Sequence, residues 1–261
     1  MFSDADAAAL YDVLNPWDPG AWPADALYEA LVGTADSVLD VGCGTGAMLV
    51  RAREQGHTGR LVGLEPDRAA LARARRRTDI EWIEGTAADA DRQHVRGPGP
   101  RDGPSGFALV TMVSHAFQCL VTDDALRASL AAIHAALRPG GLFAFETRHP
   151  RARAWQNWTP DHASTVEAPS GRRLRVWHEV ESAEDGVVAF TTTTTSAGPD
   201  ATVLRRDRSR LRFLDESALD GFLAEAGFLV EGRYGDWDRT PVTATSREII
   251  TLARRPALSR R

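Results

Sequence analysis

The nine residues VLDVGCGTG, Val38 to Gly46, decide how this chain folds. A short apolar run from Ser37 to Val41 meets three closely spaced glycines, and helical character resumes from Ala47 to Gln55. Glycine adopts backbone conformations that other residues avoid. The pattern therefore predicts a buried strand that enters a helix through a tight turn at Gly42, Gly44 and Gly46.

The same alternation continues along the next hundred residues. Periodicity and turn residues predict strands at Leu61–Glu65, Ile80–Ile83, Phe107–Val113 and Leu142–Glu146. They predict helices at Ala24–Val32, Asp67–Arg77, with Asp67 as its capping residue, and Asp123–Leu137. Strands that alternate with helices indicate βαβ units and a parallel sheet. The Gly- and Pro-rich segment Asp91–Gly106 predicts an exposed loop.

The pattern changes after residue 150. Strands without intervening helices are expected at Leu174–Val180, Val187–Ser196 and Arg206–Phe213. A helix at Asp215–Ala226 and a last strand pair at Phe228–Arg233 and Arg247–Ala253 follow. We therefore expect an N-terminal helical cap over residues 1–36, an α/β core over 37–150 and 211–256, and an antiparallel β insertion over 151–210, which is either a substrate lid or a dimer arm.

Composition limits the class of protein. The chain has 261 residues, 43% hydrophobic and 26% charged, which suits one large globular α/β domain. Its net charge of −5 offers no basic field for a nucleic acid, so no nucleic-acid partner is expected. No apolar run is long enough to span a membrane, and no signal peptide is recognised. Two cysteines give no disulfide framework, which favours a cytoplasmic location.

The glycine turn is suited to a nucleoside cofactor. A backbone without side chains approaches a ligand closely, and the N–H groups of a helix N-terminus favour a negative group. Glu65 ends the next predicted strand, where a carboxylate can bind both hydroxyls of a ribose. Gly42, Gly44 and Ala47 also satisfy the relaxed dinucleotide pattern G-x-G-x-x-A, so spacing alone leaves NAD open.

Several segments in order resemble one family. VLDVGCGTG is similar to motif I of the class I S-adenosylmethionine (SAM)-dependent methyltransferases. Similar to later family segments are LVGLEPDRAALARARR (61–76), EGTAAD (84–89), LRPGGLFAFET (137–147), LAEAGFLVEGRYGDWD (223–238) and SREIITLARR (246–255). The resemblance implies a Rossmann-like seven-stranded sheet in the order 3-2-1-4-5-7-6, with strand 7 antiparallel. It departs from the family at Ala108, where many members carry an acidic residue.

The resemblance also implies a SAM site and its residues. Asp40 and the turn of Gly42, Gly44 and Gly46 would meet the methionine end, which Tyr11 would cover. Glu65, followed by Pro66, would bind the ribose, and Asp89 the adenine amine. Ser114, directly after the fourth strand, would complete the cofactor site.

The reaction and the acceptor side are less determined. A sulfonium methyl group is already activated, so positioning supplies much of the rate, and a base is needed only for a protonated acceptor. His115 and His149 follow strands at the functional edge and are the candidate bases; the alternatives are a pocket-lining residue and a turn residue. Arg148, Trp155, Tyr234 and Asp236 are candidate substrate contacts, although tryptophans here could equally pack the insertion onto the core. No metal-like spacing occurs.

We therefore expect a methyltransferase that modifies O, N or C of a small molecule. Two alternatives stay open: a non-catalytic SAM-binding scaffold and an NAD-linked oxidoreductase. The expected partner is a small-molecule substrate, and the chain could also form a homodimer.

Overall fold

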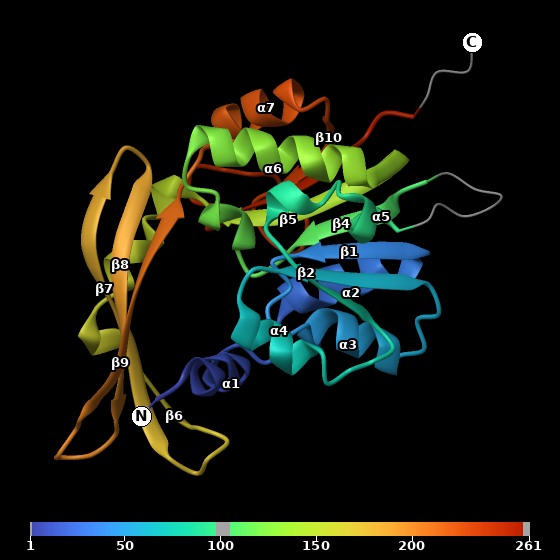
Figure 1. Cartoon of the computed structure of the whole chain (residues 1–261). Coiled ribbons are helices and arrows are strands. Elements are labelled where there is room, and N and C mark those ends of the chain that lie inside the picture. The colour runs from blue at the N-terminus through green and yellow to red at the C-terminus, as the bar shows by residue number, and fades with distance from the viewer. Residues whose placement is uncertain (1, 98–104, 258–261) are drawn as a thin grey trace.

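A computed structural model describes residues 2–97 and 105–257 of the chain. Within these ranges, seven strands form a central twisted sheet with helices on both faces (Figure 1). The strand order is β10-β11-β5-β4-β1-β2-β3. The strands span Ser37–Val41 (β1), Arg60–Glu65 (β2), Glu81–Glu84 (β3), Phe107–Met112 (β4), Leu137–Arg148 (β5), Leu229–Tyr234 (β10) and Glu248–Arg254 (β11).

The sheet topology confirms the predicted order. β11 runs antiparallel to both β5 and β10, while β1 to β5 pair in parallel. β1 also has the predicted bounds, Ser37–Val41. Because parallel strands end at the same edge, the segments that follow β1, β2, β4 and β5 lie together, and ligands bind at this edge in such folds.

Two separate cores hold helices on the two faces of the sheet. On one face, α6 (Asp123–Ala136) and α7 (Glu216–Glu225) pack onto β4 and β5 through residues such as Leu130 and Leu219. On the other face, α2 (Pro23–Thr34) and α3 (Ala47–Glu54) pack onto β1 through Tyr28 and Leu49. The predicted α/β layering follows from this burial on both faces.

Helix α4 (Arg68–Ala74) begins as expected and ends early. The Asp67 side chain accepts the N–H groups of Ala69 and Ala70 at 2.7 and 3.2 Å, which confirms its capping role. The expected helix reached Arg77, but Arg77 N–H bonds the Ala74 carbonyl, three residues back. This tighter turn ends the α-helical hydrogen bonding.

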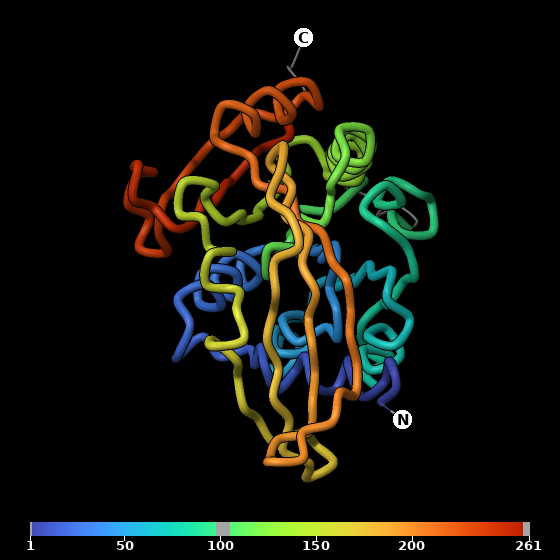
Figure 2. The backbone as a smooth tube through the Cα atoms, turned by 90° about the vertical axis from the view of Figure 1, so that its left-hand side faces the viewer, coloured from blue at the N-terminus to red at the C-terminus, as the bar shows by residue number. Residues whose placement is uncertain are grey.

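The antiparallel insertion is a second sheet of order β6-β7-β8-β9. Its strands are Ser164–Glu167, Arg173–Glu184, Val187–Ser196 and Val203–Arg212. Short 3-10 turns η3 (Pro150–Ala152), η4 (Ala154–Asn157) and η5 (Pro160–His162) lead into it. β6 was not predicted, since four residues carry too little periodicity. Figure 2 shows the long strands of this sheet side by side, with one face uncovered.

The segment Asp91–Gly106 is not simply an exposed loop. α5 (Gln93–Arg96) lies within it and Val95 is fully buried, so the expectation was wrong there. Arg60 donates to the carbonyls of Val95 and Arg96 at 3.0 and 2.6 Å, which ties the turn to β2. Residues 98–104 of this segment lie outside the described residues.

Residues 1–36 contain α2 and a further helix, α1 (Asp4–Leu14), which lies between the insertion and the core (Figure 1). Leu10 of α1 packs with Leu174 and Val176 of β7. On the core side, the Asp12 carboxylate pairs with Arg73 of α4 at 2.5 Å. No helix among the described residues has the length and apolar character that crossing a membrane requires.

Candidate functional site

The glycine turn has the left-handed backbone that its sequence predicts. The φ angles are +74° at Gly42, +55° at Gly44 and +83° at Gly46, a region that favours glycine. However, four N–H groups of the turn already have partners: Gly42 and Cys43 donate to the Leu64 carbonyl, Gly44 to Glu65, and Gly46 to the Cys43 carbonyl. The N–H groups expected to be free belong to the first turn of the helix that follows, α3 (Ala47–Glu54), and for these that expectation stays a prediction.

Glu65 holds this turn in place. Its Oε2 accepts the Gly44 N–H at 2.7 Å and its Oε1 accepts the Asp67 N–H at 2.8 Å. Burial raises the pKa of Glu65, and these two hydrogen bonds oppose that rise. Each carboxylate oxygen keeps acceptor capacity, so ribose binding by Glu65 stays a prediction.

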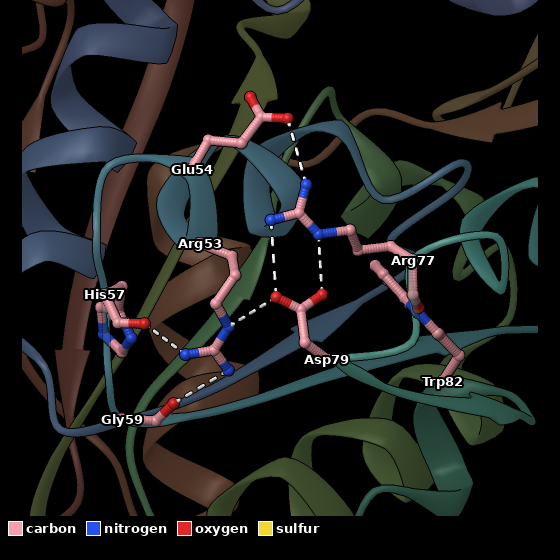
Figure 3. Close-up of polar contacts among 7 residues, drawn as sticks. All are labelled: Arg53, Glu54, His57, Gly59, Arg77, Asp79 and Trp82. Carbon is pink, nitrogen blue, oxygen red and sulfur yellow. Dashed lines mark hydrogen bonds and ion pairs between the residues drawn. The ribbon is translucent and has the colours of Figure 1, made fainter.

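The indole ring of Trp82, on β3, packs directly against the glycine turn. A Cβ at Gly46 would lie 2.2 Å from its ring, and a Cβ at Gly63 would lie 2.5 Å from it. The indole Nε1–H donates to the Arg77 carbonyl at 2.8 Å. Figure 3 shows Arg77 held in turn by Asp79 and Glu54. Trp82 was not among the predicted site residues, because it lies on β3 and reaches the turn only in the folded sheet.

Asp40 is buried at the end of β1. It is 1% exposed, and Thr111 of β4 donates its hydroxyl to Oδ1 at 2.8 Å. Burial raises the pKa of Asp40 to about 7, although the Thr111 hydrogen bond lowers it; the nearby Glu65 and Glu146 raise it further. Such a carboxylate gains free energy from any cation that comes beside it.

The turn after β4 has a strained backbone. Ser114 and His115 have φ angles of +55° and +62°, which non-glycine residues seldom adopt. The Glu146 carboxylate of β5 accepts the His115 N–H at 2.8 Å and also the hydroxyl of Tyr28. Glu146 is 2% exposed, and burial raises its pKa. A buried carboxylate therefore holds the backbone at His115, and strain of this kind gathers at functional sites.

The His115 ring meets a residue that the sequence reading missed. Its Nε2 lies 2.9 Å from Oε2 of Glu248, the first residue of β11. Arg148 of β5 stands directly opposite Glu248 in the strand register. Its guanidinium donates to Gln118 Oε1 at 3.1 Å and lies over the Trp158 ring. His115, Arg148 and Glu248 thus gather at the carboxyl edge of the sheet.

Tyr11 brings α1 to the same edge. The residue is 44% exposed as a whole, and its hydroxyl lies close to the Ser114 side chain. Burial of that hydroxyl raises the pKa of Tyr11, and the Ser114 contact opposes the rise. The next residue, Asp12, accepts the Thr45 hydroxyl of the glycine turn at 2.5 Å. α1 therefore touches both the cofactor turn and the turn after β4.

The second candidate base, His149, follows β5 at the same edge of the sheet but is buried. His149 is fully buried, and its Nδ1 accepts the Arg151 N–H at 3.1 Å as the cap of η3. Its Nε2 is 3.7 Å from Glu216. This contact favours the alternative interpretation of His149 as a turn residue, and its role as a base stays a prediction.

Two further predicted cofactor contacts, Asp89 and Pro66, lie after β3 and β2. Asp89 uses its carboxylate to cap η1 (Ala87–Asp89), accepting from the Thr86 N–H at 2.8 Å. This hydrogen bond lowers the pKa of Asp89. Pro66 is exposed directly after β2. Their contacts with adenine and ribose stay predictions.

The aromatic candidates pack mainly within the protein. Trp155 contacts Phe213, the residue directly after β9, at 4.5 Å between ring centroids, so it packs against the end of the insertion sheet. Tyr234 packs against the core that contains Tyr28 of α2 and Leu49 of α3. Asp236 is exposed, and its carboxylate accepts the N–H of Trp237 at 2.7 Å. No grouping of three or more His, Cys, Asp or Glu suited to a metal occurs among the described residues.

Comparison with known proteins identifies the core. Residues 38–141 match a family model described as a methyltransferase domain. The chain is 30% identical over 137 residues to an uncharacterized methyltransferase of Synechocystis sp., covering 51% of this chain and 57% of that protein. It is 28% identical over 195 residues to the 2-phytyl-1,4-naphtoquinone methyltransferase of Thermosynechococcus vestitus, covering 71% and 80%. The chain thus spans little more than half of the first relative.

Solved structures share the whole architecture. A SAM-dependent methyltransferase from Clostridium acetobutylicum has a TM-score of 0.71 at 14% identity, covering 96% of this chain and 98% of that one. A SAM-bound amino pentose methyltransferase from Micromonospora echinaspora has a TM-score of 0.64 at 23% identity, covering 98% of both chains. These likenesses show the fold.

The fold is therefore that of the class I SAM-dependent methyltransferases, as the sequence predicted. Within it, residues 38–141 match the methyltransferase-domain family model, and a neighbour of the same fold was solved with SAM bound. Nothing in these comparisons supports an NAD-linked oxidoreductase or a non-catalytic scaffold.

Proposed function

We propose that this protein transfers a methyl group from SAM to an oxygen, nitrogen or carbon atom of a small molecule. The observation that carries the proposal is the charge at the carboxyl edge of the sheet. Asp40, Glu65, Glu146 and Glu248 interact with one another there, and Arg148 is the cation that faces Glu146 and Glu248. The methionine end of SAM carries an ammonium, a carboxylate and a sulfonium, so its net charge is positive and an acidic edge favours it.

The glycine turn supports SAM over NAD. The N–H groups of Gly42, Cys43, Gly44 and Gly46 are bound within the protein, so they do not bind a pyrophosphate. A Cβ at Gly44 would meet no atom within 4 Å, so the apex of the turn borders open space. Acceptor-rich side chains beside an open glycine turn fit a cofactor with hydroxyl and ammonium donors.

The side chains have distinct roles in this proposal. Glu65 would accept from the ribose, and Asp40, Ser114 and Tyr11 would surround the methionine end. Bound SAM supplies a methyl group that is already activated by its positive sulfur. His115 would take the proton of the acceptor, while Arg148 and Trp158 would line the acceptor side.

The proposal has a direct test. The purified protein should be stabilised against heat by SAH and by SAM, and not by NAD, because SAH and SAM carry an amino acid end that NAD lacks. With a panel of hydroxyl, amine and carbon acceptors, SAM should be converted to SAH. Stabilisation by NAD alone, or SAH binding without turnover on any acceptor, would count against it.

The substrate class rests on more distant support. The curated relative from Thermosynechococcus vestitus acts, by its name, on a naphthoquinone, and a structural neighbour on an amino pentose. Both are small molecules, and the net charge of −5 does not favour a nucleic acid. A cytoplasmic location and a homodimer remain part of the proposal. Gel filtration with light scattering would test the homodimer.

A further inference from the structure

The contact between His115 and Glu248 has a chemical consequence. A carboxylate oxygen only accepts hydrogen bonds, so at 2.9 Å the facing nitrogen, Nε2, must carry the hydrogen. A neutral His115 is then the Nε2–H tautomer, with the lone pair on Nδ1. Within the part of the chain that the structure describes, Nδ1 forms no hydrogen bond.

The two partners are held from both sides. Glu146 binds the backbone N–H of His115 in its left-handed conformation, and Glu248 binds the ring. Glu248 faces Arg148 across the β5–β11 pair, so its own position is set by the sheet. The side chains of His115 and Glu248 are 20% and 18% exposed, which leaves the pair open to a small molecule while limiting its contact with water.

We propose that Glu248 is a positioning residue: it fixes the tautomer of His115 and so presents Nδ1 as the base for the methyl acceptor. This inference rests on the proposed methyltransferase function and narrows its substrate class. A base is needed only where the acceptor atom carries a proton that must leave. The acceptor atom therefore carries a proton, as in an O–H, an N–H or an acidic C–H, and is not a thioether sulfur or a tertiary amine nitrogen.

His115 and Glu248 together can take up the proton that the acceptor loses. The X–H bond of the acceptor breaks, its proton binds Nδ1 of His115, and its electron pair stays on X as the nucleophile. The imidazolium that forms is stabilised by Glu248 at Nε2. Nearby charges are Glu146 and Arg148 of β5; Tyr28 of α2 binds Glu146. A carboxylate that orients a histidine base is a recurring device in catalysis.

The first test reads the tautomer without any substrate. Nitrogen-15 NMR of histidine-labelled protein above pH 8, assigned with His115→Gln, should show His115 as the Nε2–H tautomer in the wild type. Glu248→Leu leaves no acceptor at Nε2 and should shift the tautomer toward the Nδ1–H form. The control is Glu231→Leu, which removes a carboxylate of β10 that pairs with Arg254 of β11. An Nδ1–H tautomer in the wild type, or an unchanged signal in Glu248→Leu, would overturn the proposal.

The second test uses turnover. Glu248→Gln should lower kcat about tenfold or more, with the KM for SAM within about twofold, and Glu248→Asp should recover part of the rate. Equal kcat in Glu248→Gln and wild type would overturn the role of Glu248. Failure of the wild type to bind SAH would instead overturn the proposed function, while the NMR result would still decide which tautomer Glu248 sets.

Discussion

Gly44 and Glu65 are joined across 21 residues, because the Gly44 N–H donates to the Glu65 carboxylate at 2.7 Å. The turn after β1 is thus shaped by the residue that ends β2. Glu65 has two tasks in the proposed site: it holds the glycine turn and it would bind the ribose. The two tasks use different lone pairs of the same carboxylate.

Replacement of this carboxylate should weaken cofactor binding. Glu65→Gln puts an NH₂ or a weaker acceptor against Gly44 N–H, and a hydrogen bond to a charged group contributes about 1.5–3 kcal/mol. We expect the Kd for SAH to rise about 10- to 100-fold by calorimetry. Glu84→Gln is the control, because Glu84 stands beside Glu65 in the strand register. Equal effects of both variants would contradict the assignment.

Two glycines of the turn should respond differently to alanine. Gly46→Ala should lower the free energy of unfolding by about 2–4 kcal/mol, since its Cβ would overlap Trp82 and its φ is +83°. Gly44→Ala meets open space and should cost only about 1–2 kcal/mol, for its left-handed backbone, but reduce SAH affinity. Denaturant unfolding and calorimetry measure both. Full SAH affinity in a folded Gly44→Ala protein would count against a cofactor at this turn.

The buried Asp40 should make stability depend on pH. Its pKa is about 7 in the fold and 3.8 as the reference value, so the folded state binds more protons between these values. Stability is therefore lost as pH rises from about 4 to 7. Asp40→Asn removes this loss and keeps an acceptor for Thr111, so its stability relative to wild type should increase with pH, by up to about 4 kcal/mol. A constant difference from pH 4 to 8 would refute the buried-acid interpretation.

Replacement of the two candidate histidines should have different effects, one on the rate and the other on stability. His115→Ala should change the free energy of unfolding by at most about 1 kcal/mol and spare SAH binding, while the rate falls about 10²- to 10⁴-fold. His149→Ala should instead cost about 2–4 kcal/mol of stability, because it leaves a cavity and an unpaired Arg151 N–H. Unfolding curves and single-turnover rates test this. An inactive but fully stable His149→Ala protein would favour His149 as a base.

The insertion and α1 offer a final comparison. Asp12→Ala removes the contacts from α1 to Thr45 and Arg73, so SAH affinity should fall several-fold and limited proteolysis near α1 should increase. Asp4→Ala removes only the exposed pair with Arg205 and should change neither beyond experimental error. Equal SAH affinity in the wild type, Asp12→Ala and Asp4→Ala would show that α1 does not contribute to the cofactor site.

The sequence by itself determined most strands, most helices and the position of the cofactor turn. These depend on local periodicity, on glycine at positive φ and on capping residues such as Asp67, all of which act over a few residues. The family resemblance then supplied the sheet order. The short strand β6 and the short helix α5 were not predicted, because four residues carry too weak a local signal.

Only the tertiary structure decided which side chains meet. His115 and Glu248 are 133 residues apart, and Glu146 reaches the His115 backbone across 31 residues. No periodicity encodes such pairs, because they depend on the register of β5 against β11 and on the backbone of one strained turn. The same long-range packing buried His149 and left His115 open, although both follow strands at the same edge of the sheet.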